Sequence, residues 1–274
     1  MSPWKKLGNL APSGLGGARV ELHWAAQLPA LGVGRALVEP RDDSSHTALT
    51  WRRGCWFSEP VPGPVNLRAG LRAEDLTLIL ERDGEVVRSC SLFGQTLVEG
   101  LRWLRNRVEE LGGPKVEGRI ELRSKLPEHP IGRGANFRAE LGPGLAELSR
   151  WFGNASYLLE KLGPDASPIR TWPHHFDMAT LLPAGGQTAG SPQTVGVGLS
   201  SADDHFPEPY FYVSPWPPPD PTGLPALPRG GWQVEGFFGA VLTATELLAE
   251  SDQEEAAREF CDAAITASRQ LLAP

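Results

Sequence analysis

Cysteine and long apolar runs are both scarce in this chain of 274 residues. Its three cysteines, Cys55, Cys90 and Cys261, lie far apart and form no C-x-x-C spacing. Isolated cysteines of this kind are typical of a reducing compartment, where thiols stay unpaired. The sequence has no apolar run of about 18 residues, and no apolar segment follows the charged start Met-Ser-Pro-Trp-Lys-Lys. We therefore predict a cytoplasmic protein that does not enter a membrane.

Positive charge is also in short supply. The chain has 26 Lys and Arg against 33 Asp and Glu, which gives a formal net charge of −7 at pH 7. Binding to a phosphate backbone requires a concentrated basic surface. The charge therefore argues against nucleic acid as a partner, while a small-molecule ligand remains open. The sequence does not indicate an oligomeric state.

The common catalytic signatures are missing. The sequence has no Gly-x-Ser-x-Gly nucleophile elbow, no phosphate-loop motif, no dinucleotide fingerprint after a strand and no His-Glu-x-x-His helix. No cysteine lies in a recognisable catalytic pattern. Any enzyme chemistry must therefore come from histidines and carboxylates, and the substrate is not indicated.

The composition is that of a folded protein with an unusual number of tryptophans. Apolar residues make up 41% and charged residues 22% of the chain, which is ordinary for a globular protein with a sizeable core. The nine tryptophans are a high number. An indole ring needs a packed wall and a partner for its N–H, so these residues either line a pocket or fill a core.

Periodicity and turn signals predict four helices and about eight or nine strands. The clearest local signals are the Asp83-Gly84 turn of a hairpin and a capping box from Thr96 to Glu99. The predicted helices cover residues 20–38, 96–111, 145–162 and 251–271. The predicted strands cover residues 47–53, 65–71, 76–82, 85–92, 116–126, 169–182, 194–200, 210–214 and 232–243.

Strands that follow one another directly indicate an α+β fold with a mainly antiparallel β-sheet and about four packed helices. No linker separates two independently cored halves, which favours a single domain. We expect a flexible lead-in over residues 1–18 and one domain over 19–274, with a break near 127–143 as the fallback.

The segment 169–182 is the main candidate for a functional site, because it contains two histidines and an aspartate within four positions. Its bulky and β-branched residues predict one strand, so His175 and Asp177 share a face, while His174 and Phe176 share the other. Pro173 cannot donate to a ladder and favours a bulge, which would bring His174 toward His175.

This segment suggests acid–base chemistry. His174 or His175 would act as a base, with Asp177 or Glu208 orienting it. Four residues are therefore candidate catalytic residues: His174, His175, Asp177 and Glu208.

The same residue types could instead bind zinc, iron or manganese, which accept His together with Asp or Glu ligands. His175 and Asp177 would supply two ligands, and His205 from a following loop would supply the third. Further candidates for the remaining positions are Asp203, Asp204, Glu208, Glu235, His46 and His129.

A third hypothesis is a binding or interaction domain without catalysis, in which aromatic residues form a groove. The candidate substrate-binding residues are Trp172, Phe176, Trp216, Trp232 and Arg133, the last as an anchor for an anion. It is equally open that Asp177 only accepts structural hydrogen bonds and that the histidines are satisfied at the rim of the core, because buried polar groups are paired whether or not they act.

The order of several short motifs resembles an uncharacterised bacterial family, the domain of unknown function 5996. The motifs include His46 at the start of a strand, Ser58-Glu59-Pro60, Phe93-Gly94, Arg150-Trp151-Phe152, Phe176-Asp177-Met178-Ala179 and Glu208-Pro209-Tyr210-Phe211-Tyr212. The resemblance covers roughly residues 20 to 272. It implies one domain and supplies no reaction, and the histidines before Phe176 are a departure from the family pattern.

Overall fold

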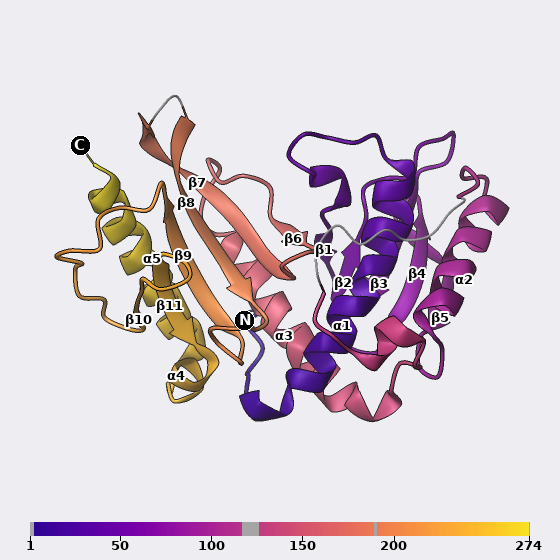
Figure 1. The fold of residues 1–274 in the computed structure, drawn as a ribbon, viewed down its shortest axis with the longest axis horizontal. Helices are drawn as coiled ribbons and strands as arrows, with labels where there is room; N and C mark the ends of the chain where they lie inside the picture. Colours follow the sequence, from indigo (N-terminus) through magenta and orange to yellow (C-terminus); the bar gives the residue numbers. More distant parts are fainter. Residues whose placement is uncertain (1–2, 117–125, 189–190, 274) are drawn as a thin grey trace. The chain divides into compact units, whose positions relative to one another are not determined.

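Residues 3–116, 126–188 and 191–273 are described by the structure, a computed structural model (Figure 1). They form two antiparallel sheets of five and six strands, together with four helices of at least seven residues. The predicted α+β class with mainly antiparallel strands is therefore confirmed. The predicted strand over 116–126 falls largely on residues 117–125, which lie outside the described part of the chain.

Contacts within the chain group its residues into two compact units, which we treat separately. The first-sheet unit comprises Gly14–Ser149 and Arg170–Phe176, and the second-sheet unit comprises Met1–Ser13, Arg150–Ile169 and Asp177–Pro274. The lead-in over 1–18 and the single domain over 19–274 stay predictions. No helix in the described ranges is long and apolar enough to cross a membrane.

The first-sheet unit is a β-meander in which each strand pairs with the next one along the chain, in the order β1-β2-β3-β4-β5. Its strands are β1 (Thr50–Arg52), β2 (Cys55–Phe57), β3 (Leu67–Arg72), β4 (Thr77–Arg82) and β5 (Glu85–Ser91), and it also contains β6 (Arg170–Trp172). Its helices are α1 (Gly16–Pro29), which contacts β3, and α2 (Leu97–Glu110), which contacts β4. Short 3₁₀ helices in the chain cover Pro12–Gly14, Ser45–Thr47, Pro130–Arg133 and Ala139–Leu141, and a π-helical turn covers Ala30–Arg35.

Two local features of this unit agree with the sequence predictions, and one helix differs in its bounds. The β4–β5 hairpin turns at Asp83 and Gly84, whose φ angles of 53° and 89° are the positive values that a tight hairpin turn requires. Thr96 and Glu99 form both hydrogen bonds of the predicted capping box at the start of α2. The predicted helix over 20–38 begins earlier, at Gly16, and its regular α-helical part ends at Pro29, which has no N–H to donate.

The second-sheet unit places strands in the order β10-β11-β9-β8-β7, all antiparallel. The strands are β7 (Asp177–Thr188), β8 (Ser191–Ser200), β9 (Tyr210–Trp216), β10 (Gly231–Gln233) and β11 (Gly239–Thr243). The helices are α3 (Gly142–Leu159), which belongs to this unit from Arg150 on, α4 (Ala244–Leu248) and α5 (Gln253–Leu272). One predicted strand over 232–243 is thus two strands, because the chain turns at Gly236 with a φ of 80°.

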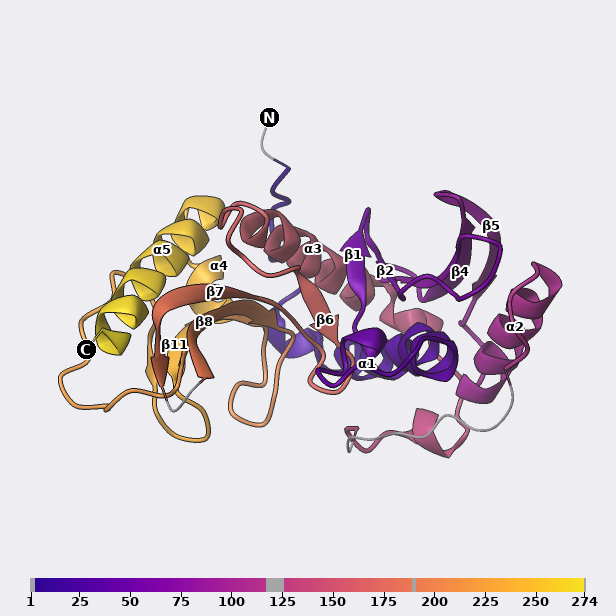
Figure 2. The same cartoon turned by 90° about the horizontal axis from the view of Figure 1, so that it is seen from above.

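This sheet has one apolar face and one polar face. Val195, Val197 and Leu199 of β8 are fully buried, and α5 contacts β7, β8, β9 and β11. Figure 2 shows α5 on the convex side of the curved strands β7 and β8. The alternate residues of β8 and β9, among them Gly198 and Tyr212, therefore belong to the concave face, where the candidate site lies.

Candidate functional site

The predicted strand 169–182 is wrong, because the chain turns in its middle. β6 ends at Trp172, residues 173–176 form a turn, and β7 begins at Asp177. The Phe176 N–H donates to the Trp172 carbonyl at 2.7 Å, and Phe176 has a φ of 58°. The alternation that put His175 and Asp177 on one strand face therefore does not apply.

Two side chains from α1 hold this turn at the carbonyl of Pro173. The carbonyl accepts a hydrogen bond from Gln27 Nε2 at 2.7 Å and one from His23 Nε2 at 2.8 Å. Because a carbonyl oxygen only accepts, Nε2 of His23 carries the proton. Burial lowers the pKa of His23 to about 4 against the opposing effect of this hydrogen bond, so the ring is neutral near pH 7.

Phe176 belongs to the core of the first-sheet unit. Its side chain is 1% exposed, stacks on the His23 ring at 4.9 Å and lies 5.3 Å from the Trp56 ring. The prediction that it lines a binding groove is not supported by these contacts, which explain it as a packing residue.

His174 and His175 lie on the exposed side of the turn. Their ring centroids are 4.4 Å apart, and the His174 ring lies 6.0 Å from the half-buried Trp172. Partial desolvation, and then the neighbouring His175, lower the pKa of His174. The two imidazoles are therefore adjacent, surface-accessible groups.

The other predicted residues have local structural contacts. Glu208 Oε2 accepts from the N–H of Thr245 at 2.9 Å and from its hydroxyl at 2.7 Å, which holds the first turn of α4. His205 is exposed and its ring meets Phe237 edge-on at 6.3 Å. Arg133 is exposed on a short 3₁₀ helix, and Trp216 is 59% exposed at the end of β9.

The proposed metal ligands do not form a recognisable cluster. His175 belongs to the first-sheet unit, whereas Asp177 and His205 belong to the second. Across residues 3–116, 126–188 and 191–273, no group of three or more His, Cys, Asp or Glu side chains is arranged to hold a metal ion. The metal hypothesis thus gains no support from the geometry.

Asp177 instead pairs with a tyrosine on the concave face of the second sheet. Tyr212 donates its hydroxyl hydrogen bond to Asp177 Oδ2 at 2.6 Å. The ring reaches β7 from β9 by crossing β8 at Gly198, the cross-strand partner of both Tyr212 and Ala179. A Cβ atom at residue 198 would lie 2.7 Å from the Tyr212 hydroxyl and 2.6 Å from the Met178 carbonyl oxygen. Glycine at this position is therefore a condition for the pair.

A second tyrosine–aspartate pair lies two residues away on β9. Tyr210 donates to Asp203 Oδ2 at 2.5 Å, and the other oxygen of Asp203 accepts the backbone N–H groups of His205 and Phe206, both at 2.8 Å. Residue Ala202, directly before Asp203, has a φ of 148°, a value that is strained for a residue with a side chain. The two backbone N–H groups and the Tyr210 hydroxyl hold the Asp203 carboxylate in place.

Both phenols remain protonated at neutral pH. Burial is the first cause that raises the pKa of Tyr210, followed by its hydrogen bond to Asp203. Burial, and then the charge of Asp177, raise the pKa of Tyr212 well above its ordinary value. The tyrosines therefore act as hydrogen-bond donors to the carboxylates.

A cavity of about 350 Å³ adjoins these pairs at the β10–β11 end of the sheet. Its lining residues are Phe206, Gly231, Trp232, Gln233, Val241, Thr243 and Glu246. Val241 and Thr243 are the cross-strand partners of Tyr212 and Tyr210, so the two tyrosines and the cavity share one sheet face. The Phe206 ring also packs on Tyr210 at 5.0 Å. Trp232, predicted from the sequence as a binding residue, is among the lining residues, but its pairing with Ala240, and of Ala240 with Val213, directs its side chain to the opposite face of the sheet.

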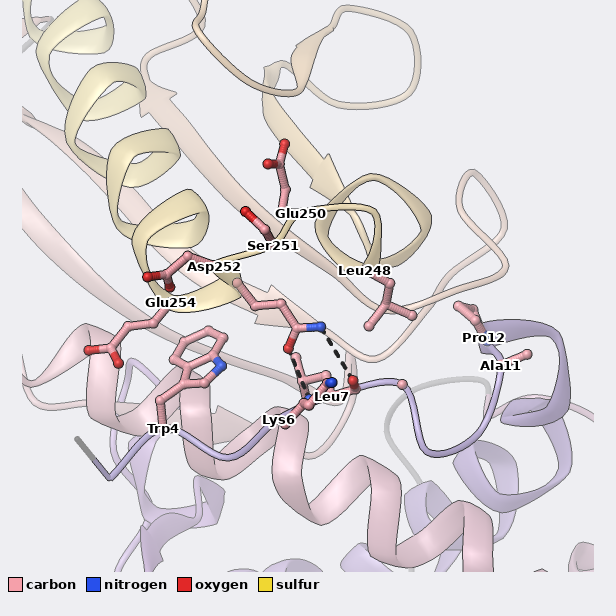
Figure 3. Close-up of a pocket in the computed structure, with 12 residues that line it drawn as sticks. Trp4, Lys6, Leu7, Ala11, Pro12, Leu248, Glu250, Ser251, Asp252 and Glu254 are labelled. Carbon is pink, nitrogen blue, oxygen red and sulfur yellow. Dashed lines mark hydrogen bonds between the residues drawn. The ribbon is translucent and has the colours of Figure 1, made fainter. Parts of the chain in front are cut away.

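A larger hollow of about 810 Å³ lies between the N-terminal segment and the α4–α5 connection (Figure 3). Two side-chain amides hold this segment in extended form. The Asn154 amide bonds both the N–H and the carbonyl of Lys5, at 2.8 and 2.7 Å, and Gln253 does the same for Leu7, at 3.0 and 3.3 Å.

Two acidic side chains around the larger hollow have partners in the protein. Glu250 pairs with Arg229, and Glu254 accepts from Tyr157 at 3.0 Å and lies 3.6 Å from the ammonium of Lys161. These interactions, together with the hydrogen bonds of the Asn154 and Gln253 amides, hold residues 4–12 against the rest of the unit. The hollow is therefore explained by the packing of this N-terminal segment.

Sequence reasoning missed the two tyrosines as site residues, although it placed them on a strand. The Tyr-x-Tyr spacing of residues 210 and 212 was the available signal, because alternate residues of a strand share a face. Asp177 and Asp203 were both named as candidates, but with histidines as their expected partners.

No protein-family model, no curated protein and no solved structure matches this chain. The resemblance to the uncharacterised bacterial family stays an expectation from its short motifs.

Proposed function

We propose that this protein binds a small organic molecule in the cavity between Phe206 and Trp232. The observation that supports the proposal most strongly is the position of the cavity beside the two tyrosine–aspartate pairs on the concave sheet face. Ligand pockets typically measure about 300–1,000 Å³ and combine aromatic walls with a few placed polar groups. The cavity volume falls within this range, and the lining includes the aromatic residue Phe206 and the polar residues Gln233, Thr243 and Glu246.

We favour binding over catalysis because the acid–base hypothesis depends on one continuous strand over residues 169–182, and the chain turns at residues 173–176. The base candidates His174 and His175 lie on an exposed turn, and Asp177 is hydrogen-bonded to a tyrosine hydroxyl. Glu208, the other candidate orienting group, holds the start of α4. The aromatic-groove hypothesis is kept in a changed form. Of the five residues that it named, only Trp232 is among the residues that line the cavity.

Filling the cavity tests the proposal. A Cβ atom built at Gly231 meets no atom within 4 Å, and Gly231 has no positive φ, so Gly231→Leu places a side chain at the cavity without strain. Gly153→Leu on α3 is the matched control, because Gly153 is equally open and does not line the cavity.

A fragment library is screened by ligand-observed NMR against the full chain and both variants. We expect fragments that bind the unchanged protein and the Gly153→Leu variant, and that lose binding in the Gly231→Leu variant. Fragments that bind all three proteins equally, or a library without binders, would contradict the proposal.

A further inference from the structure

Two side-chain amides of the second-sheet unit bind the main chain of residues 4–8, the docked segment, as a neighbouring strand would. The Asn154 amide accepts a hydrogen bond from the Lys5 N–H at 2.8 Å and donates one to the Lys5 carbonyl at 2.7 Å. The Gln253 amide does the same for Leu7, at 3.0 and 3.3 Å, and Figure 3 shows these two bonds as dashed lines. A side-chain amide has both an acceptor and donors, so each one reproduces the pairing of a peptide group in a sheet.

The spacing of the two anchored residues is that of an extended strand. Lys5 and Leu7 are two positions apart, and alternate residues of an extended chain present their N–H and C=O groups at the same edge. Both amides therefore recognise main-chain groups, which every extended peptide has. Asn154 is 1% exposed on α3, so its amide is a fixed part of the unit. Peptide recognition by strand addition works in this way, with main-chain hydrogen bonds for affinity and side-chain contacts for specificity.

The side chains of the docked segment define what the site accepts. Leu7 is 2% exposed and Trp4 is half-buried, whereas Lys5 and Lys6 are exposed. Gly8 follows with a φ of 96°, a conformation that favours glycine. The site therefore fits an extended segment with an aromatic residue, two basic residues, an aliphatic residue and a glycine in that order.

The charge beside the docked segment complements its lysines. Lys6 lines the hollow of about 810 Å³ together with Glu250, Asp252 and Glu254. Glu250 and Glu254 have the cationic partners described above, but Asp252 only accepts the N–H of Glu255 at the start of α5 and forms no ion pair among the described residues. This side of the hollow therefore remains negative and favours a basic segment.

We propose that this site binds an extended basic segment of a partner protein, and that residues 4–8 occupy it as the chain's own ligand. A partner segment can displace them without any change in a sheet, because the main-chain partners of Lys5 and Leu7 are side chains and not strands. The site lies apart from the cavity lined by Phe206, so this inference and the proposed function can fail independently.

The probe is a synthetic peptide with the sequence of residues 3–9, Pro-Trp-Lys-Lys-Leu-Gly-Asn, with blocked ends. Its dissociation constant is measured by fluorescence anisotropy of the labelled peptide, on the unchanged full chain and on the full-length Leu7→Asp variant. Aspartate in place of the buried Leu7 weakens the docked segment and vacates the site. We expect this variant to bind the peptide at least about tenfold more tightly than the unchanged chain, because the docked segment competes as an intramolecular ligand.

A second variant covers the case in which Leu7→Asp does not fold. Lys5→Glu/Lys6→Glu changes two exposed side chains, so it leaves the core intact and replaces attraction to the acidic side of the hollow with repulsion. Circular dichroism checks the fold of both variants, and we expect the peptide to bind this one too more tightly than the unchanged chain. If the peptide binds neither folded variant, the inference is overturned.

Two methylated peptides separate main-chain recognition from nonspecific binding. N-methylation at the leucine removes the N–H that Gln253 accepts in the docked segment. N-methylation at the second lysine is the matched control, because the N–H of Lys6 has no hydrogen-bond partner in the described ranges. We expect the first change to weaken binding about tenfold and the second less than about threefold. Equal losses would contradict recognition through the main chain.

Two further measurements test the class of partner. A peptide with glutamate in place of both lysines should bind about tenfold more weakly than the probe at low salt, and equal binding would overturn the basic class. Light scattering on the unchanged chain tests the other possible occupant, a second copy. We expect a monomer. A dimer that Leu7→Asp converts into a monomer would show that two copies exchange this segment, and would overturn the partner protein.

Discussion

Two short segments of this protein each bring a pair of polar rings together, and they do so in opposite ways. His174 and His175 are neighbours in sequence on a turn, and both side chains are exposed. Tyr210 and Tyr212 are two residues apart on β9, share one sheet face, and each donates to its own aspartate. The comparison teaches that spacing, and not mere density of polar residues, creates a shared site. Four predictions test it, in order of expected effect.

We expect the largest effect on stability from a substitution that crowds the ring of Tyr212. Gly198→Val places a Cβ atom 2.7 Å from the Tyr212 ring and 2.6 Å from a backbone oxygen, so the ring or strand β8 must move. We expect a loss of about 3 kcal/mol or more in the free energy of unfolding, measured by urea denaturation.

Gly196→Ala is the control for this substitution. It lies on the same face of the same strand, and its added Cβ atom would meet its nearest neighbours at an ordinary 3.6 Å. We expect a change below about 1 kcal/mol. Equal losses in the two variants would show that Tyr212 does not depend on Gly198 for its place.

The next effect concerns the residue that holds the histidine turn. The pKa of His23 is about 4 in the folded protein and 6.5 for a free histidine, so the unfolded chain binds a proton at a higher pH than the folded chain does. The stabilising contribution of neutral His23 is therefore complete above about pH 6.5 and is lost as the pH falls toward 4. The full loss corresponds to about 3 kcal/mol.

His23→Phe retains an aromatic ring against Phe176 and removes both the titration and the donor to Pro173. We expect the stability difference between the unchanged protein and this variant to shrink between pH 7 and pH 4, measured by denaturant unfolding at each pH. A difference that stays constant over this range would refute the buried, neutral state of His23.

A smaller effect is expected when one tyrosine hydroxyl is removed. Tyr212→Phe leaves the partly buried carboxylate of Asp177 without its phenol donor, at a cost of about 1–2 kcal/mol in the free energy of unfolding. Tyr157→Phe serves as the comparison, because that hydroxyl donates to the partly exposed Glu254 at 3.0 Å and should matter less. A larger loss for Tyr157→Phe would reverse the ranking.

The smallest effect is expected on the histidine side. His174→Ala and His175→Ala change exposed side chains, so each should alter the free energy of unfolding by less than about 0.5 kcal/mol. Binding of the library fragments should be unchanged in both variants. If either substitution abolished binding, the turn and not the tyrosine strand would carry the function.

Sequence reasoning succeeded where the physical cause is local. The Asp83-Gly84 turn and the Thr96–Glu99 capping box depend on residues at most three positions apart, and both occur as predicted. The α+β class also followed from the order of the elements. Fold features of this kind are fixed by short-range backbone preferences.

The features that sequence reasoning did not predict depend on residues that are far apart in the chain. The turn at 173–176 is held at Pro173 by His23 and Gln27, which lie 150 and 146 residues earlier in the chain. No pattern near residue 173 predicts these two hydrogen bonds. The tyrosine–aspartate pairs depend on the pairing of Gly198 with Tyr212 across two strands. The register of a sheet is a tertiary property, so the sequence could name Asp177 and Asp203 but not their partners.

The side-chain amide resonance of Gln233 gives the most direct test of the central claim, that the cavity beside Tyr210 and Tyr212 is the ligand site. A library fragment that binds the full chain is titrated into the uniformly ¹⁵N-labelled protein, and the Gln233 signal is assigned by its loss in Gln233→Leu. We predict that this resonance shifts in a saturable manner while the ring signals of His174 and His175 stay unchanged. Saturable shifts of the histidine signals with a stationary Gln233 resonance would contradict the account.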